Sequence, residues 1–235
     1  MNITFVSLKG GCGKTTTAWL LATYFANHYK KIGFNGFTLT DLDYLQSNME
    51  QYNEKLPKSK QMTVETISTR EEFLALADNT LYDEDMINII DTGRYDSETN
   101  FLSYVVSDII IVTLNPREEI EFRNAIATLI KMDELFSKED VDAPLVKILY
   151  TRVHPNSKFS SFSPQNAYLR EFKFETIKPE LYQCVVYNNK LTTIGSQHGE
   201  SFWTYPHEDD SKLYAGMQEL VQSIKQDFKK IKGLS

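Results

Sequence analysis

Cysteine, glycine and proline are all scarce in this chain, which has two, ten and seven of them among 235 residues. Cys12 and Cys184 form neither a CxxC pair nor a four-cysteine zinc site, so we expect reduced thiols. Apolar runs such as Ile109–Val112 are far shorter than the ~20 residues of a membrane-spanning helix. The first residues lack the basic, apolar and small-residue series of a secretion signal. We therefore expect a cytoplasmic protein.

Positive charge is also in short supply, and charge is unevenly distributed. The chain has 25 Lys and Arg against 32 Asp and Glu, a net charge of −7. Residues 65–98 hold ten acidic residues and two arginines, a net −8, so the other 201 residues carry a net +1. Basic residues gather in 147–178, six against two acidic ones, and in 225–232, four against Asp227. Either cluster could face nucleic-acid phosphates, although a charge run is usually only a solvated face.

Strand and helix signals alternate along the chain. Short apolar, β-branched runs predict strands at Asn2–Leu8, Phe37–Asp41, Met62–Ile67, Met86–Asp91, Asp108–Leu114, Leu145–Thr151 and, weakly marked, Glu175–Ile177. Longer segments with helical spacing of apolar residues predict helices at Thr15–Lys31, Thr69–Asp78, Ser97–Val106, Arg117–Phe136 and Ser211–Lys232. Polar stretches predict surface loops at Asn53–Gln61 and His154–Gln165.

This alternation is typical of the α/β class, with a mostly parallel twisted sheet and helices on both faces. Neither a repeat nor a Pro/Gly-rich linker divides the chain, so we expect residues 1–235 to form a single domain. Ligands of such sheets bind beyond the carboxyl ends of the strands.

Three of the ten glycines stand at positions 10, 11 and 13, in the segment KGGCGKTT between the first strand and the first helix. Glycines let backbone N–H groups turn toward an anion, and the helix N-terminus adds partial positive charge. Lys14 can reach the β- and γ-phosphates, and the Thr15 hydroxyl can bind Mg²⁺. Leu8 replaces the first glycine of the ordinary GxxxxGK[ST] loop, and the segment fits the deviant form KGGxGK[ST], which begins with an additional lysine. The layout predicts a phosphate-binding loop.

Carboxylates follow two of the predicted strands. Asp41 and Asp43 end the second strand as Asp-Leu-Asp, at alternate positions that point the same way. Asp91 ends the apolar strand MINIID. A carboxylate at the tip of a buried strand beside the phosphate loop can hold Mg²⁺, often through water.

These segments resemble the ParA/MinD family of deviant Walker-A ATPases, most of all the small plasmid-partition ParA proteins. KGGCGKTT is similar to the signature loop of the family, TLTDLD to its switch I strand and INIIDTG to its Walker B strand with switch II. SDIIIVTLNPREEIEF resembles the next strand and the loop after it. The resemblance covers most of the chain and is most specific in the loop.

The resemblance implies a site for ATP and Mg²⁺. The residues that it assigns to nucleotide binding are Lys9, Gly10, Gly11, Cys12, Gly13, Lys14, Thr15 and Thr16. Lys14 would contact the β- and γ-phosphates, and Thr15 would bind Mg²⁺ with the support of Asp41 and Asp91.

Lys9 and Asp43 complete the catalytic set that the resemblance implies, together with Lys14. Lys9 matches the signature lysine, which crosses an ATP-sandwich dimer and neutralises charge that develops during hydrolysis. Asp43 matches the aspartate that positions the attacking water. ATP would hold two subunits together, and slow hydrolysis would separate them.

The sequence departs from the family pattern at four places. Switch II reads Asp-Thr-Gly-Arg-Tyr-Asp, with one glycine and no proline. Tyr44–Gln46 stands where relatives have Pro-Gln after the second aspartate of switch I. Thr151 and Arg152 stand where relatives often read adenine with an asparagine. Cys12 occupies a position usually filled by a small apolar residue, and packing is its simplest role.

The resemblance implies an ATP hydrolase that positions DNA in plasmid or chromosome partition. We expect no helix-turn-helix module before the loop, as in short partition ATPases that work with a small ParB-like centromere-binding protein. That partner would stimulate hydrolysis, and binding of non-specific DNA would place the homodimer on the nucleoid.

Three alternatives stay open. A MinD-like or polar-positioning ATPase would act at a membrane or a protein scaffold, although the apolar stripe of the last helix more readily docks on the sheet. A metallocluster carrier would need a CxxC motif, which the sequence lacks. A scaffold that does not hydrolyse ATP would be compatible with the altered switch I.

Overall fold

The computed structural model describes residues 1–7, 11–43, 49–54, 56, 58–93, 97–152, 159–183 and 211–231. Its strands are β1 (Asn2–Val6), β2 (Gly36–Asp41), β3 (Val64–Thr66), β4 (Met86–Asp91), β5 (Ile109–Leu114), β6 (Leu145–Tyr150) and β7 (Glu180–Gln183). Its α-helices are α1 (Lys14–Ile32), α2 (Met49–Glu54), α3 (Arg70–Leu76), α4 (Glu98–Val105), α5 (Glu119–Glu139), α6 (Ser163–Glu171) and α9 (Ser211–Ile231). Short 3₁₀ turns lie at Lys58–Lys60 and Phe159–Phe162, and a π-helical turn at Ala77–Leu81.

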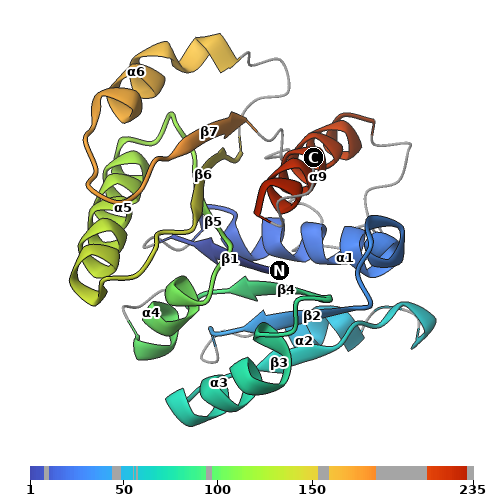
Figure 1. Ribbon diagram of the computed structural model, residues 1–235. Coiled ribbons are helices and arrows are strands. Elements are labelled where there is room, and N and C mark those ends of the chain that lie inside the picture. Colours follow the sequence, from blue (N-terminus) through green and yellow to red (C-terminus); the bar gives the residue numbers. More distant parts are fainter. Residues whose placement is uncertain are drawn as a thin grey trace.

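The strands form one sheet in the order β3-β2-β4-β1-β5-β6-β7, and each neighbouring pair in it is parallel. Helices lie on both sides of this twisted sheet (Figure 1). The predicted fold class is therefore confirmed. Most of the predicted strands and helices are present too, with small differences at their ends.

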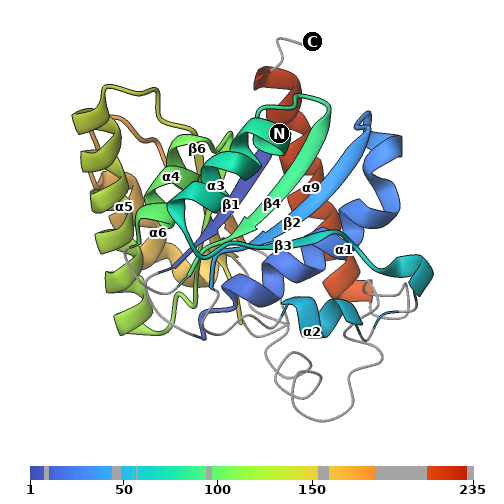
Figure 2. The same cartoon turned by 90° about the horizontal axis from the view of Figure 1, so that it is seen from below.

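Two helical layers cover the sheet, because successive strand side chains point to opposite faces. In β5, Ile109 and Ile111 belong to the core under α1 and α9, whereas Ile110 and Val112 belong to the core under α5. Figure 2 shows α1 and α9 on one side of the strands and α3, α4 and α5 on the other. The last helix packs on the sheet through buried residues such as Val221, as its apolar stripe predicts.

Local signals explain where two of the helices begin. The Thr69 side chain accepts the N–H of Glu72, whose own side chain accepts the N–H of Thr69, which is a capping box for α3. The Ser97 hydroxyl accepts the N–H of Asn100 at the start of α4. Both caps stand where the sequence predicts the helices to begin.

The last strand that the structure describes is Glu180–Gln183, and Glu175–Ile177 forms no strand, so the prediction of a strand there is wrong. The three N–H groups of Glu175–Ile177 donate to the Asp133 carboxylate on α5, at 2.7, 2.7 and 3.1 Å. Donors held by a side chain cannot pair with a neighbouring strand. Burial raises the pKa of Asp133, but these hydrogen bonds and that of the Thr176 hydroxyl outweigh it and hold the pKa below its ordinary value.

The prediction of a loop at His154–Gln165 is also wrong at its end, where α6 begins. Pro164 stands in the first turn of α6, where a missing N–H costs little. Leu169 is buried in the core beside α5. The buried Tyr150 hydroxyl donates to Asn166 Oδ1 at 2.7 Å, and burial raises the pKa of Tyr150 to about 12. Long-range contacts, rather than local composition, explain this helix.

The other predicted loop, Asn53–Gln61, starts in the last residues of α2 and includes the 3₁₀ turn Lys58–Lys60. The Asn53 side chain closes this segment, because its amide donates to the Met62 carbonyl and its oxygen accepts the Met62 N–H, both at 2.7 Å. Polar composition therefore identifies a surface segment but not its short helical turns.

A buried ion pair joins α9 to the sheet. Lys147 on β6 is 1% exposed, and its Nζ lies 2.6 Å from Asp227 Oδ2 on α9. Lys147 Nζ also donates to the Ser223 hydroxyl at 3.1 Å. Arg152, two residues after the end of β6, pairs with the buried Glu121 of α5. The expectation that the basic cluster beginning at Lys147 faces nucleic acid is therefore wrong for these two cations, because tertiary packing turns both toward carboxylates.

We predict that Lys147→Met lowers the free energy of unfolding by about 3–5 kcal/mol, because it leaves a buried carboxylate without its partner. Urea unfolding measures this loss. Adding Asp227→Leu should recover most of it, since an apolar pair of similar volume needs no compensating charge.

The exposed pair of Arg123 and Glu119, whose side chains are 76% and 75% exposed, supplies the control. Arg123→Ala should change the free energy of unfolding by less than about 1 kcal/mol. A double variant as unstable as Lys147→Met alone would contradict this account of the buried pair.

Candidate nucleotide-binding site

The glycine loop enters α1 at the edge of the sheet where the parallel strands end. Gly11 and Gly13 have positive φ angles of 83° and 87°, a conformation that favours glycine. A Cβ at Gly13 would also lie 3.3 Å from the Thr151 hydroxyl oxygen. The backbone therefore requires glycine at Gly13 for two separate reasons. Lys9 and Gly10 lie outside the described residues.

The side chain of Lys14, the first residue of α1, reaches the end of β4. Its Nζ lies 2.7 Å from Asp91 Oδ1 and also donates to the Thr92 carbonyl oxygen. Lys14 is 6% exposed and Asp91 0%. Burial raises the pKa of Asp91, while the Lys14 ammonium and the Thr15 hydroxyl act against that rise. The loop lysine and the strand-end aspartate thus form one buried pair.

Asp41 lies beside this pair. It is the register partner of Asp91 on the neighbouring strand β2, and both strands direct their odd-numbered side chains to the face that α1 covers. Asp41 Oδ1 accepts the N–H of Asp43 at 3.0 Å. Because β2 ends at Asp41, the expectation that Asp43 is a strand position is wrong, although its carboxylate is near enough to raise the pKa of Asp91.

The segments that follow β2 and β4 touch each other at Gly93. A Cβ there would lie 3.2 Å from the Leu42 carbonyl oxygen and 3.7 Å from the Asp43 Cα. The Gly93 N–H donates to Asn100 Oδ1 on α4 at 3.1 Å. The glycine after Asp91 hints at this close approach in the sequence, but nothing in the sequence marks Asn100.

These residues fit a phosphate chain with Mg²⁺. A Thr15 hydroxyl and the carboxylates of Asp41 and Asp91 are hard oxygen ligands of the kind that Mg²⁺ prefers. Asp91 Oδ2 is buried and makes no hydrogen bond of normal geometry to the described residues, even though the Thr15 hydroxyl lies near. Among the described residues there is no cluster of three or more His, Cys, Asp or Glu that could hold a metal ion by itself.

A second pair lies on the far side of the glycine loop. Arg152 follows β6 with a positive φ of 54°, and its guanidinium pairs with Glu121 of α5. Glu121 Oε2 accepts the N–H of Asn115 at 2.8 Å. The sequence marks Thr151 and Arg152 as a departure at a base-reading position, but Glu121 gives no signal because it lies inside a helix.

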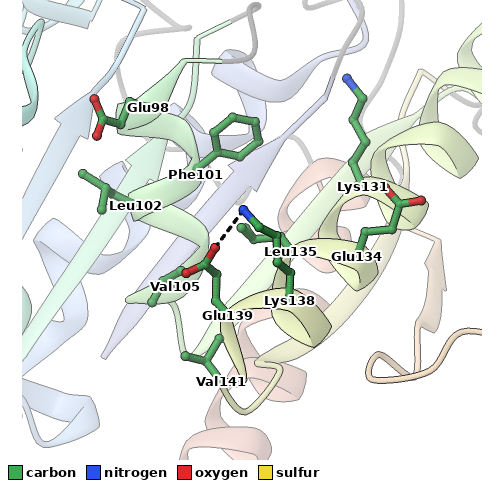
Figure 3. Close-up of a pocket in the computed structure, with 10 residues that line it drawn as sticks. All are labelled: Glu98, Phe101, Leu102, Val105, Lys131, Glu134, Leu135, Lys138, Glu139 and Val141. Carbon is green, nitrogen blue, oxygen red and sulfur yellow. Dashed lines mark ion pairs between the residues drawn. The ribbon is translucent and has the colours of Figure 1, made fainter.

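A groove of about 710 Å³ lies between α4 and α5 (Figure 3). Phe101, Leu102 and Leu135 are among its apolar lining residues. Lys138 and Glu139, paired at 3.3 Å, also line it. None of the predicted site residues that the structure describes lines this groove.

The parallel sheet, with a glycine loop between β1 and α1, is the P-loop fold of the ParA/MinD class, as the sequence predicts. A family model described as VirC1 protein matches residues 1–170 of the 235, and the chain belongs to this family. None of the curated protein sequences is significantly similar to the chain.

Solved structures of this class share the fold at low sequence identity. A plasmid partition protein from Borrelia burgdorferi B31 bound to AMPPNP is 16% identical, with 94% of this chain and 98% of that chain covered and a TM-score of 0.59. The pNOB8 ParA protein is 15% identical, with 96% and 99% covered and a TM-score of 0.59, and it is also known bound to nonspecific DNA. A chain of the MinC:MinD cell division protein complex of Aquifex aeolicus is 16% identical, with 100% of this chain and 96% of that chain covered and a TM-score of 0.52.

We predict that Lys14→Ala lowers the affinity for ADP about 10- to 100-fold, because charge-assisted hydrogen bonds to phosphate are lost. The buried Asp91 carboxylate would also remain beside the phosphates without its counter-charge. Isothermal titration measures this loss, and Lys31→Ala, an exposed change in the last turn of the same helix, is the control. Equal affinities for the two folded variants would contradict the assignment.

Proposed function

We propose that this protein is an ATPase of DNA partition, which dimerises with ATP and hydrolyses it to ADP and phosphate. The observation that carries the proposal is the buried Lys14–Asp91 pair at the mouth of the glycine loop, with Asp41 in register beside it. One edge of the sheet thus carries an ammonium group that can bind phosphate. The same edge carries carboxylates that can bind a divalent cation. We further propose that residues 1–235 form a single domain.

Binding of the phosphate chain would fall to the first turn of α1 and to Lys14. The N–H groups of that turn, including those of Thr15 and Thr16, have no intrahelical partners, and the helix N-terminus favours an anion. The Cys12 side chain packs between the loop and β5: it is 1% exposed, and its sulfur lies 3.4 Å from the Thr113 hydroxyl. Lys14 would exchange the Asp91 carboxylate for the β- and γ-phosphates.

Hydrolysis would need an attacking water in the right position and positive charge to offset the negative charge that develops on the phosphates. Mg²⁺, held by Thr15 with Asp41 and Asp91, would supply compensation of phosphate charge when bound. Asp43, whose N–H is held by Asp41, would orient the attacking water. Lys9 would act across the dimer on the phosphates of the second subunit, as the family resemblance implies.

We predict that Asp43→Ala and Lys9→Ala leave the affinity for ATP within about threefold of the wild type but slow turnover about 100-fold, as expected for groups that act in the transition state. Phosphate release measures turnover, and sedimentation with ATP should show weaker dimers for Lys9→Ala alone. Unchanged turnover in Asp43→Ala would favour a scaffold that does not hydrolyse ATP. A loss of affinity in Lys9→Ala as large as in Lys14→Ala would contradict its action across the dimer.

Non-specific DNA is the second partner that we propose, with a small centromere-binding protein that stimulates hydrolysis. Its surface would be the lysine patch, which we define as Lys30 and Lys31 in the last turn of α1 and Lys229 and Lys230 in the last turn of α9. All four are exposed. The helices lie side by side on one face of the sheet (Figures 1 and 2).

An aromatic contact brings the two ends of this patch together. The rings of Phe34, just after α1, and Phe228 on α9 have centroids 4.6 Å apart. Asp227 offsets little of this charge at the surface, because it is 2% exposed and paired with Lys147 at 2.6 Å. Lys230 Nζ also lies 3.8 Å from Asp227 Oδ1. The lysines also complement the negative ends of two helix dipoles, so the patch is favourable even without DNA.

We predict that Lys229→Glu with Lys230→Glu lowers the ATP-dependent affinity for DNA at least about tenfold and reduces the slope of log affinity against log salt by about 2. Fluorescence anisotropy at several salt concentrations measures both. The matched control is Lys173→Glu with Lys178→Glu, two exposed lysines on the α6–β7 connection. Equal losses in both double variants would show that only net charge matters and would contradict the patch.

The same proteins should be tested on anionic vesicles. The described residues include no helix long and apolar enough to span a membrane. Leu220, Val221 and Ile224 of α9 are buried against the sheet, so they are not available as a membrane-binding stripe. ATP-dependent retention on vesicles instead of DNA would favour a MinD-like function.

A further inference from the structure

The glycine loop is held from behind by threonines at the ends of two neighbouring strands. The Thr151 hydroxyl, directly after β6, donates to the Cys12 carbonyl oxygen at 2.5 Å. Thr113 on β5 contacts the Cys12 sulfur at 3.4 Å. Both threonines are buried, at 0% and 1% exposure. The loop therefore rests on β5 and β6 as well as on the strand from which it emerges.

The contact of Thr151 decides how one peptide of the loop is turned. The described peptide bonds are all trans, so the carbonyl and N–H of the Cys12–Gly13 peptide point in opposite directions. Holding the Cys12 carbonyl on Thr151 aims the Gly13 N–H away from β6. Gly13 is the N-cap of α1, where free N–H groups and the helix dipole bind anions.

Thr151 is itself fixed by its surroundings. Its N–H donates to the Leu114 carbonyl at 2.8 Å. The next residue, Arg152, has the left-handed φ of 54°, which is uncommon for a residue other than glycine and needs support from its neighbours. That support is the ion pair with Glu121, which is held by the Asn115 N–H. The position of the Thr151 hydroxyl thus depends on the start of α5.

We propose that Thr151 is a positioning residue for phosphate binding, which orients the Cys12–Gly13 peptide and so links the carboxyl end of β6 to the glycine loop. The inference rests on the proposed nucleotide-binding function. It gives a role to a threonine that stands where a base-reading residue is expected. Because Arg152 pairs with Glu121, the phosphate affinity would also depend on the start of α5, which lies outside the glycine loop.

The test compares Thr151→Val, which keeps the shape but loses the donor, with Thr151→Ser, which keeps the donor. We expect Thr151→Val to weaken ADP binding about five- to tenfold, the effect of one buried hydrogen bond, and Thr151→Ser to stay within about twofold of the wild type. AMP is the internal control, because it lacks the β-phosphate that the loop holds. The ratio of AMP to ADP dissociation constants should therefore fall in Thr151→Val.

Glu121→Gln is a second variant, because it weakens the support of Arg152 without changing Thr151. It should lower the same ratio about two- to threefold, and it keeps the test valid if Thr151→Val does not fold. Equal weakening of ADP and AMP, wild-type ADP binding in Thr151→Val, or no rescue by Thr151→Ser would each overturn the proposal.

Failure of the proposed function would look different. If the wild type and Lys14→Ala bind ADP equally, or neither binds it, both proposals fall. If Lys14→Ala loses ADP but Thr151→Val binds it like the wild type, only the positioning role of Thr151 falls.

Discussion

The buried ion pair between Lys14 and Asp91 is the interaction on which the site of this protein depends. Two charges taken out of water are tolerated only when each is closely paired, so the start of α1 and the end of β4 must keep their relative positions. The pair also stores the two groups that a magnesium nucleotide would use, an ammonium and a carboxylate. Under the proposed function, binding would be an exchange of partners, in which phosphate would replace Asp91 on Lys14 and a cation would replace Lys14 on Asp91.

A uniformly parallel sheet supplies the frame for this exchange. Because every strand runs the same way, the segments after β1, β2, β4 and β6 come to one edge, and residues as distant as Gly13, Asp41, Asp91 and Thr151 lie in one region. The helices α1 and α9 run back across the sheet and end near the opposite edge, where the lysine patch lies. The sheet direction therefore separates the proposed phosphate chemistry from the proposed DNA surface.

Much of this could be predicted from local patterns, and the errors have a common cause. The strand Met86–Asp91 is predicted to the residue, and the helix predicted from Thr69 begins there, with Thr69 as the N-cap of α3. The sequence predicts a strand at Glu175–Ile177, but the N–H groups of this segment donate to the Asp133 carboxylate on α5. Lys147 belongs to a basic cluster that could face nucleic acid, but it is buried in an ion pair with Asp227, eighty residues further along the chain. In each case the residue that binds the segment is too far away in the sequence to be seen in a local pattern.

The sequence by itself determined the fold class, the glycine loop and the aspartates that lie near it, because periodicity, glycine spacing and strand-end charges act over a few neighbouring residues. Only the tertiary structure decided that Lys14 is paired with Asp91, that Thr151 supports the loop and that Arg152 is bound to Glu121. The reason is physical. These contacts join segments far apart in the chain, and their geometry follows from strand order and register, which many sequences with the same local patterns could arrange differently.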